Sequence, residues 1–212
     1  MNQAVNKGQP RAPRGSTNQN PADIGLVALL REDFETYDHD PLQPGLWAVM
    51  LHRFGNWRMG IKPKPLRAPF TVAYNAMHTA LSLTMGIDLS YSVKLGRRVR
   101  IWHHGGIFVN AHSIGNDVHL RHNVAIGIAS RHDPGALPTI EDGVDIYAGA
   151  CIAGDVRVGA NSLVGANSVV TQDVPPNTTV FGNPARRAPT TAMPSSSGNG
   201  NGQPNIDGRR GG

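Results

Sequence analysis

The stretch from Ile140 to Val170, IEDGVDIYAGACIAGDVRVGANSLVGANSVV, carries an apolar residue at every sixth position. These positions are Ile140, Ile146, Ile152, Val158, Val164 and Val170. A second row, four residues further along, holds small side chains at Val144, Ala150, Val156, Ser162 and Ser168. A period of six fits neither an α-helix nor the alternation of one strand. It is typical of a parallel β-helix with three short strands per coil, in which the sixth residue points inward and the small residues fit tight corners.

The same spacing extends upstream of this stretch. It includes Leu95, Ile101 and Ile107 and, after a slip of one residue, Ile114, Leu120 and Ile126. The interval from Ile126 to Ile140 is eight residues longer than one repeat, so residues 127–139 are predicted to protrude as a loop. We expect Pro175 and Pro176 to end the repeat, since consecutive prolines cannot continue a strand ladder.

The chain on either side of the repeat differs in composition. Residues 22–85 show helical apolar spacing, interrupted by prolines and Gly60 into about three helices. Residues 1–21 and 188–212 are rich in Asn, Gln, Pro, Ser and Gly, and are predicted to be disordered tails. The predicted organisation is therefore a helical segment over 22–85 followed by a β-helix domain over 86–187.

Composition and charge exclude several classes of protein. The chain has 212 residues, 25 of them Gly and 16 Pro, and is 17% charged, which disfavours a helical bundle or a coiled coil. The net charge of +5 lies mostly in the tails, because residues 1–21 carry Lys7, Arg11 and Arg14 without an acid and residues 188–212 add a net +1. The remainder is nearly neutral, so no nucleic-acid partner is expected.

The cysteine content and the hydropathy of the chain indicate its cellular compartment. Cys151 is the only cysteine, so no disulfide can form within the chain, and no secretory leader is recognised. The most apolar stretch, Leu66 to Ile87, is interrupted by Asn75 and His78, so no membrane span is expected. These observations favour a cytoplasmic protein.

Three motifs connect the chain to a known family. They are Gly86-Ile87-Asp88, the segment IWHHGGIFVN at residues 101–110, and Gly182-Asn183-Pro184-Ala185-Arg186 after the repeat. With these motifs, residues 26–187 resemble the hexapeptide-repeat acyltransferases and, among them, the serine acetyltransferase family.

The resemblance implies a left-handed β-helix and acetyl-CoA as acyl donor. It also implies a homotrimer, which can pair into a hexamer, with active sites between neighbouring subunits. The family's catalytic base falls on His103 and its Asp partner on Asp88. Asp40 matches an acceptor-binding aspartate, and Ala148 a residue whose backbone meets CoA.

The chain departs from the serine enzymes at their acceptor site. Trp102 stands where the family has an Asp before the base, and Ala136-Leu137 stand where it has an Arg-His pair. The segments around His103 and His122 look closer to the colanic-acid type of acetyltransferase. The predicted acceptor therefore leans toward a sugar hydroxyl of an exopolysaccharide precursor. The alternative is L-serine, which would place the chain in cysteine biosynthesis.

An imidazole suits this chemistry because a thioester is already activated. Direct transfer needs a base that removes the acceptor's proton, and neutral His can do so near pH 7. We expect Asp88 to accept the other ring N–H of His103 from an adjacent coil of the same face. His104 is the alternative base, because WHHGG permits a shift of one residue.

Other residues are weaker candidates for the site. Arg186 and Arg187 follow the terminating Pro and suit the CoA phosphates, with a solvated charge as the alternative. Arg131 and His132, with Asp133, could contact the acceptor from the predicted loop. Trp102 could supply an apolar platform for a sugar ring.

Two other classes stay open. Some γ-type carbonic anhydrases share the β-helix, and His103, His104, His112, His119 and His122 form a suggestive group. The paired-His spacing of that family is missing, so no metal is expected. A non-catalytic scaffold is the second class, although the presence of both Asp88 and His103 argues against it.

Overall fold

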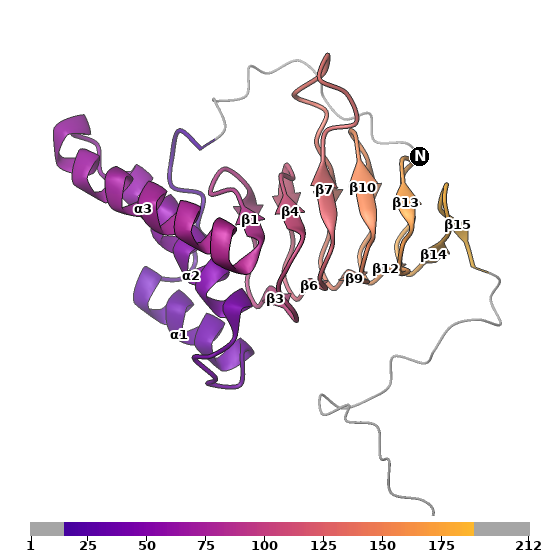
Figure 1. The fold of residues 1–212 in the computed structure, drawn as a ribbon, viewed down its shortest axis with the longest axis horizontal. Helices are drawn as coiled ribbons and strands as arrows, with labels where there is room; N and C mark the ends of the chain where they lie inside the picture. Colours follow the sequence, from indigo (N-terminus) through magenta and orange to yellow (C-terminus); the bar gives the residue numbers. More distant parts are fainter. Residues whose placement is uncertain (1–14, 189–212) are drawn as a thin grey trace, which may run out of the picture.

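The computed structural model describes residues 15–188. Helices gather at one end, and a stack of short strands runs away from them (Figure 1). The helices are α1 (Leu26–Thr36), α2 (Pro44–Trp57) and α3 (Lys64–Met85), with a 3₁₀ turn, η1 (Arg58–Gly60), between the last two. None of the helices in the described part is long and apolar enough to cross a membrane.

The strands form three sheets, which we name faces A, B and C. Face A contains β1 (Ile87–Leu89), β4 (Ile107–Val109), β7 (Ala125–Gly127), β10 (Cys151–Ala153) and β13 (Val169–Val170). Face B contains β2 (Lys94–Leu95), β5 (Ser113–Ile114), β8 (Thr139–Ile140) and β11 (Arg157–Val158). Face C contains β3 (Arg100–Ile101), β6 (His119–Leu120), β9 (Asp145–Ile146), β12 (Leu163–Val164), β14 (Thr179–Phe181) and β15 (Arg186–Arg187).

The chain visits the three faces in turn, and neighbouring coils pair in parallel register, as Ile87 with Ile107 on face A illustrates. Only β15 among the named strands pairs antiparallel, against β14. The mainly β fold that the six-residue period predicts, a parallel β-helix preceded by helices, is confirmed.

The interior of the coils matches the predicted core. Every sixth-position residue from Leu95 to Val170 is at most 2% exposed. The small second-row residues are buried at the corners, where Ser162 and Ser168 also bond to backbone. Ser162 Oγ donates to Pro175 O at 2.8 Å, and Gly182 N–H donates to Ser168 Oγ at 3.1 Å. Hydroxyls are therefore tolerated inside because their hydrogen bonds are satisfied.

Helix α2 covers the open end of the first coil with polar side chains. Arg53 donates to the carbonyls of Leu95 and Gly96, at 3.0 and 2.6 Å, and Asn56 donates to Tyr91 O at 2.8 Å. Arg53 also pairs with Asp33 of α1, and both side chains are fully buried. These side chains donate to carbonyls that would otherwise accept from the N–H groups of a further coil, so the sheet edge is closed.

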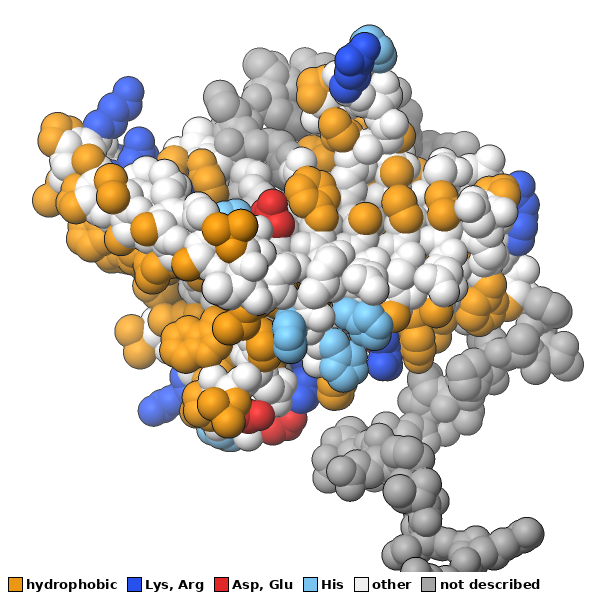
Figure 2. Space-filling model, viewed as in Figure 1, with side chains coloured by type: hydrophobic (Ala, Val, Ile, Leu, Met, Phe, Trp, Pro, Cys, Tyr) orange, Lys and Arg blue, Asp and Glu red, His pale blue; other side chains and the backbone are white. Residues whose placement is uncertain are grey.

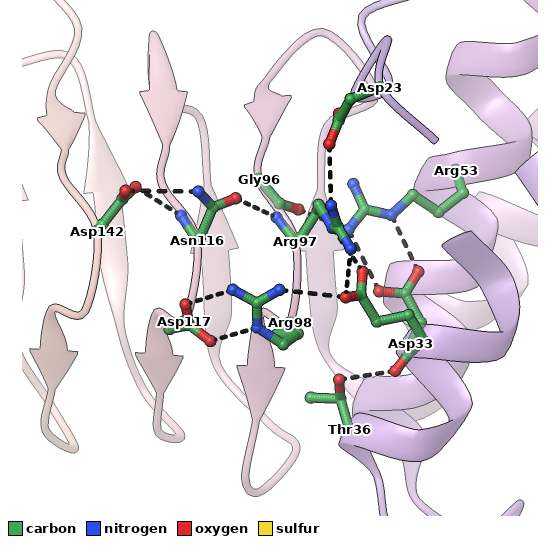
Figure 3. Close-up of polar contacts among 11 residues, drawn as sticks. Asp23, Asp33, Thr36, Arg53, Gly96, Arg97, Arg98, Asn116, Asp117 and Asp142 are labelled. Atoms are coloured by element: carbon green, nitrogen blue, oxygen red, sulfur yellow. Dashed lines mark hydrogen bonds and ion pairs between the residues drawn. The ribbon is translucent and has the colours of Figure 1, made fainter. Parts of the chain in front are cut away.

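An ion-pair network fastens α1 to the β-helix (Figure 3). Arg97 pairs with Asp23 and Glu32, and Arg98 pairs with Glu32 and Asp117, at 2.6 to 3.1 Å. The hydrogen bond from Arg97 lowers the pKa of the Glu32 carboxyl below its usual value. The network connects α1 and the residue Asp23 before it to the first two coils.

Two predictions about the ends of the fold need correction. The disordered tail predicted over 1–21 is wrong for residues 15–21, since Gln19 N–H donates to Asn56 Oδ1 at 3.1 Å and Asn20 Nδ2 donates to Arg53 O at 2.9 Å. Side-chain hydrogen bonds hold this polar segment where apolar burial cannot. Residues 1–14 and 189–212, the rest of the predicted tails, lie outside the described residues.

The repeat also does not end at Pro175 and Pro176. Val174 still forms a parallel bridge with Val158, and β14 pairs in parallel with β12. The two prolines lie in the corner between faces B and C, outside the named strands, where a missing N–H removes no ladder hydrogen bond. The coil therefore continues past them.

Candidate active site

His103 lies in the turn that joins β3 to β4, at the corner between faces C and A. Gly105 and Gly106 in this turn have φ of 98° and 65°, a region that glycine adopts easily. Gly86, which ends α3, lies against them, because a Cβ built on it would be 3.1 Å from Gly105 Cα. Ile107 N–H also donates to Gly86 O at 2.9 Å. The end of α3 thus fixes the turn that carries His103.

The imidazole of His103 is exposed, and its ring meets that of His122. The two centroids are 5.6 Å apart and the planes are 63° apart, an edge-to-face contact. His104 is exposed as well, but among the ring contacts of the described residues it is His103 that meets His122. Several His side chains gather over the region of β3 and β6, as Figure 2 shows.

Asp88 lies at the centre of β1, on face A, opposite Phe108 of β4. His103 follows β3 of the same coil and lies in the corner turn before β4 rather than on face A, so the expectation that both residues share one face from adjacent coils is wrong. Within residues 15–188, Asp88 pairs with His78 of α3, with Oδ1 and Nε2 3.4 Å apart. The Asp88 side chain is 40% exposed, so it can still take a second partner.

Sequence reasoning missed His78, because nothing in its spacing placed it beside Asp88. Its ring stacks on Tyr74, with centroids 5.5 Å apart. Its Nε2 is buried and makes no well-aligned hydrogen bond with the described residues. The contact with Asp88 is therefore long and poorly directed.

Trp102 is held rigidly beside His103. Its indole N–H donates to His119 Nδ1 at 2.8 Å, and the two rings are stacked. The guanidinium of Arg100 lies 4.0 Å from the indole centroid and also pairs with Asp38. Burial lowers the pKa of His119, which favours the neutral ring that the indole bond requires. The indole is 39% exposed, so it presents a fixed apolar surface next to the candidate base.

The strand register aligns a row of residues along the corner between faces C and A. Ile101 pairs with Leu120, and Leu120 with Ile146, so the residues two positions further on also align. These residues, which we call the corner row, are His103, His122 and Ala148. Gly149 N–H donates to His122 O at 3.1 Å, so a backbone hydrogen bond joins the coil that carries His122 to the coil that carries Ala148. The predicted base and the predicted CoA contact are thus two coils apart on one edge.

The other predicted acceptor residues come from separate parts of the chain. Asp40 lies between α1 and α2, where its Oδ1 accepts from Leu42 N–H at 2.9 Å. Arg131 and His132 are exposed in the loop between β7 and β8, which projects from the stack in Figure 1. Within residues 15–188 of one chain, no hydrogen bond, ion pair or ring contact joins any of the three to His103.

Arg186 and Arg187 lie on β15, at the last coil. Both are exposed, and they line a cavity of about 150 Å³ with residues of that coil. A larger cavity of about 950 Å³ lies between residues 18–23 and face B, but none of the predicted site residues lines it. The chemistry of the corner row, rather than cavity size, therefore identifies the candidate site.

The histidines considered for zinc do not converge. His112 precedes β5 at another corner, and His119 is engaged with Trp102. In the described part of the chain, no group of three or more His, Cys, Asp or Glu side chains is arranged to hold a metal ion. The carbonic-anhydrase alternative gains no support from this arrangement.

Comparison with known sequences identifies relatives over most of the β-helix. No protein-family model matches the chain. It is 36% identical over 143 residues to the serine acetyltransferase of Escherichia coli K12, covering 67% of this chain and 50% of that protein. It is 33% identical over 144 residues to the serine acetyltransferase of Mycobacterium tuberculosis, covering 68% and 60%. The chain thus spans about half the length of the first of these relatives.

Solved structures give the same result. Soybean serine acetyltransferase has 31% identity and a TM-score of 0.64, over 77% of this chain and 69% of that one. The Neisseria gonorrhoeae enzyme has 28% identity and a TM-score of 0.64, over 77% and 66%. These matches confirm the left-handed β-helix, and they give no support to a closer resemblance to colanic-acid acetyltransferases. The chain belongs to the serine acetyltransferase family of hexapeptide-repeat acyltransferases.

Proposed function

We propose that the chain is an acetyl-CoA-dependent O-acetyltransferase, with L-serine as the leading acceptor. The observation that carries this proposal is the exposed His103 imidazole, framed by glycines at the corner of a β-helix of this family. A Brucella abortus serine acetyltransferase solved with coenzyme A supports the donor, at 25% identity and a TM-score of 0.65. The relatives favour L-serine over the sugar acceptor that the sequence motifs suggest.

His103 acts as the base in this proposal. Its unprotonated ring nitrogen takes the acceptor's hydroxyl proton as the hydroxyl oxygen bonds to the thioester carbon, and the carbonyl electron pair moves onto oxygen. When that pair returns, the carbon–sulfur bond breaks and the thiolate takes the proton from His103. No covalent enzyme intermediate is needed, because the thioester is already activated.

Asp88 is proposed to orient His103. A carboxylate that accepts the second ring N–H fixes the tautomer and stabilises the imidazolium that forms. The contact with His78 is long at 3.4 Å, so Asp88 is not committed to that partner. The Asp88→Asn variant is expected to lower kcat with little change in the KM for acetyl-CoA.

CoA is proposed to lie along the corner row beyond His103. Ala148 would meet it through its backbone, and Arg186 and Arg187 would reach its phosphates from the last coil. This assignment rests on the family resemblance and on the alignment of Ala148 with His103.

A homotrimer, which can pair into a hexamer, is proposed as the active form. Face A supports this, because its outward residues form an apolar row across four strands, visible in Figure 2. The row consists of Phe108, Ala125, Cys151 and Val169, and Phe108 is 48% exposed in the single chain. Asp40, Arg131 and His132 are proposed to meet the acceptor at an active site between neighbouring subunits. The protein is proposed to act in the cytoplasm.

A sugar hydroxyl is the second candidate acceptor, and Trp102 is the observation that favours it. A rigid, partly exposed indole beside the base is a suitable platform for a sugar ring. Leu137, at the position of the family's His, is buried in the described chain and offers no polar group to an amino acid.

Thiol release from acetyl-CoA tests the proposal. The purified full chain is assayed with L-serine and, in parallel, with nucleotide sugars and polysaccharide fragments. Turnover on L-serine supports the leading acceptor, and turnover only on a glycan replaces it with the second. If no hydroxyl acceptor increases thiol release over the rate with acetyl-CoA alone, the proposed function is wrong.

A further inference from the structure

His122 occupies the position between the proposed base and the proposed CoA contact. It lies one coil beyond His103 in the corner row, and Ala148 lies one coil beyond it. Its ring contacts that of His103, with 5.6 Å between centroids. A thioester that reaches His103 from Ala148 must therefore pass His122.

The two ring nitrogens of His122 lie in different surroundings. Nδ1 is buried and has no hydrogen-bond partner among the described residues. The residue as a whole is partly exposed, and Nε2 is not among those buried atoms, so Nε2 is the nitrogen that a ligand can reach. A buried N–H without a partner is rarer in proteins than a buried acceptor without one. The neutral ring therefore places its proton on Nε2, toward the open side.

We infer that His122 is a second catalytic residue, whose Nε2–H donates a hydrogen bond to the carbonyl oxygen of the bound acetyl thioester. This inference rests on the proposed function. The bond would strengthen as negative charge develops on that oxygen during attack, so it would stabilise the transition state more than the bound substrate. His122 keeps its proton throughout, while the transferred proton moves between acceptor, His103 and the leaving thiolate.

The neighbouring side chains are less suited to this role. Arg121 lies over the Tyr147 ring, with its guanidinium carbon 4.4 Å from the centroid. His119 is engaged by the Trp102 indole through Nδ1. Of the side chains in the corner row, only His122 combines a reachable donor with contact to the base ring.

Two matched variants test the inference in the full chain. His122→Phe keeps an aromatic ring against His103 but has no N–H, whereas His122→Gln keeps a neutral N–H donor. We measure kcat, the KM for acetyl-CoA, and acceptor-independent hydrolysis of acetyl-CoA, which passes through the same oxyanion. His122→Leu replaces the Phe variant if that protein does not fold, as judged by circular dichroism and size.

The expected result is a fall in kcat of about 10²- to 10³-fold for His122→Phe, the effect of losing one oxyanion donor. Hydrolysis should fall in proportion, the KM for acetyl-CoA should stay unchanged, and His122→Gln should keep activity within about tenfold of wild type. The pH dependence of kcat/KM should keep its shape in both variants, since His103 remains the base.

Three results would overturn the inference. These are wild-type activity in His122→Phe, equal loss in both variants, and a change confined to the KM for acetyl-CoA. Loss of the acidic limb of the pH profile in His122→Gln would instead make His122 the base, and so would also contradict it. Failure of the proposed function is distinguishable, because the wild-type chain would then transfer acetyl to no acceptor, and the inference would be wrong with it.

Discussion

Inward positions of the coils repeat one type of side chain, whereas outward positions of the same coils do not. At the ends of three face C strands, the inward residues Ile101, Leu120 and Ile146 are equivalent, each at most 1% exposed. Two residues further on, the outward positions of the same coils hold His103, His122 and Ala148, three side chains with different chemistry. The interior repeats because each coil must fill the same space, whereas the exterior can vary without loss of packing.

The difference explains how one scaffold can carry a localised site. The position of an outward residue on the surface of the β-helix is fixed by the coil that carries it and by the inward residue beside it. Catalytic groups placed there are held by a rigid backbone that does not depend on them. Substitutions of buried residues should therefore change mainly the stability of the fold. Substitutions of exposed residues near His103 should change mainly the activity.

The buried pair of Asp33 and Arg53, where the helices cover the end of the first coil, tests how much a buried side chain contributes to stability. In Asp33→Ala the guanidinium would stay buried without its counter-ion, which typically costs about 3–5 kcal/mol. The free energy of unfolding by urea measures this loss. Asp23→Ala is the control, since Asp23 is a 65% exposed partner of Arg97 and should cost less than about 1 kcal/mol. Equal losses in the two variants would contradict the expected role of burial.

Trp102 should show the opposite behaviour, a large effect on activity with little on folding. Trp102→Ala removes the apolar surface beside His103 and is expected to lower kcat/KM for a sugar acceptor about tenfold or more, from a loss of roughly 1.5–3 kcal/mol of apolar contact, and to change kcat/KM for L-serine less. The KM for acetyl-CoA should not change. Trp102→Phe keeps a ring and should be milder, and an unaltered acceptor preference in the Ala variant would exclude the indole from the acceptor site.

His52 gives a pH-dependent test of the buried side. Burial, together with the charge of Arg53, lowers its pKa from 6.5 to about 3, so the folded protein holds it neutral. The unfolded chain binds a proton below pH 6.5, and stability is therefore lost as the pH falls from 6.5 toward 3. This single group should cost about 1.4 kcal/mol for each pH unit in that window.

Urea unfolding of wild type and His52→Gln at about pH 7.5 and about pH 5.5 measures the effect. The variant should be less stable at the higher pH but lose less on acidification. Part of the dependence should remain, because burial also lowers the pKa of His119. An identical pH dependence in both proteins would contradict the assignment to His52.

The smallest effect is expected for the exposed ion pair of Arg157 and Glu141 on the outside of the coil. Nη1 and Oε1 are 3.0 Å apart, but Arg157 is 61% exposed, so solvent screens the pair. Arg157→Ala should change the free energy of unfolding by less than about 1 kcal/mol. A loss as large as that of Asp33→Ala would mean that exterior residues stabilise the coils after all.

The inside of the β-helix could be predicted from sequence because its period is enforced by geometry. Every inward residue from Leu95 to Val170 is found buried. Pro175 and Pro176 misled the prediction, because a corner between strands accepts prolines that a strand would not. Residues 15–21 were also misassigned, since the bonds from the Gln19 backbone N–H to Asn56 and from the Asn20 side chain to Arg53 O leave no apolar pattern.

The candidate site was only partly predictable. His122 could have been placed beside His103, because each lies two residues after an inward residue, Leu120 and Ile101. The pairing of Asp88 with His78 could not, since it depends on how α3 packs on β1. Helix-to-sheet packing brings together residues that share no period, so spacing alone does not predict it.

Two variants two residues apart test the central claim most directly. In Ile101→Ala, an inward methyl-bearing side chain is removed, and we expect a loss of about 2–5 kcal/mol in the free energy of unfolding. In His103→Ala, we expect kcat for acetyl transfer to fall about 10²- to 10⁴-fold while stability changes by less than about 0.5 kcal/mol. An active His103→Ala, or one that is as unstable as Ile101→Ala, would contradict the separation of a structural inside from a catalytic outside.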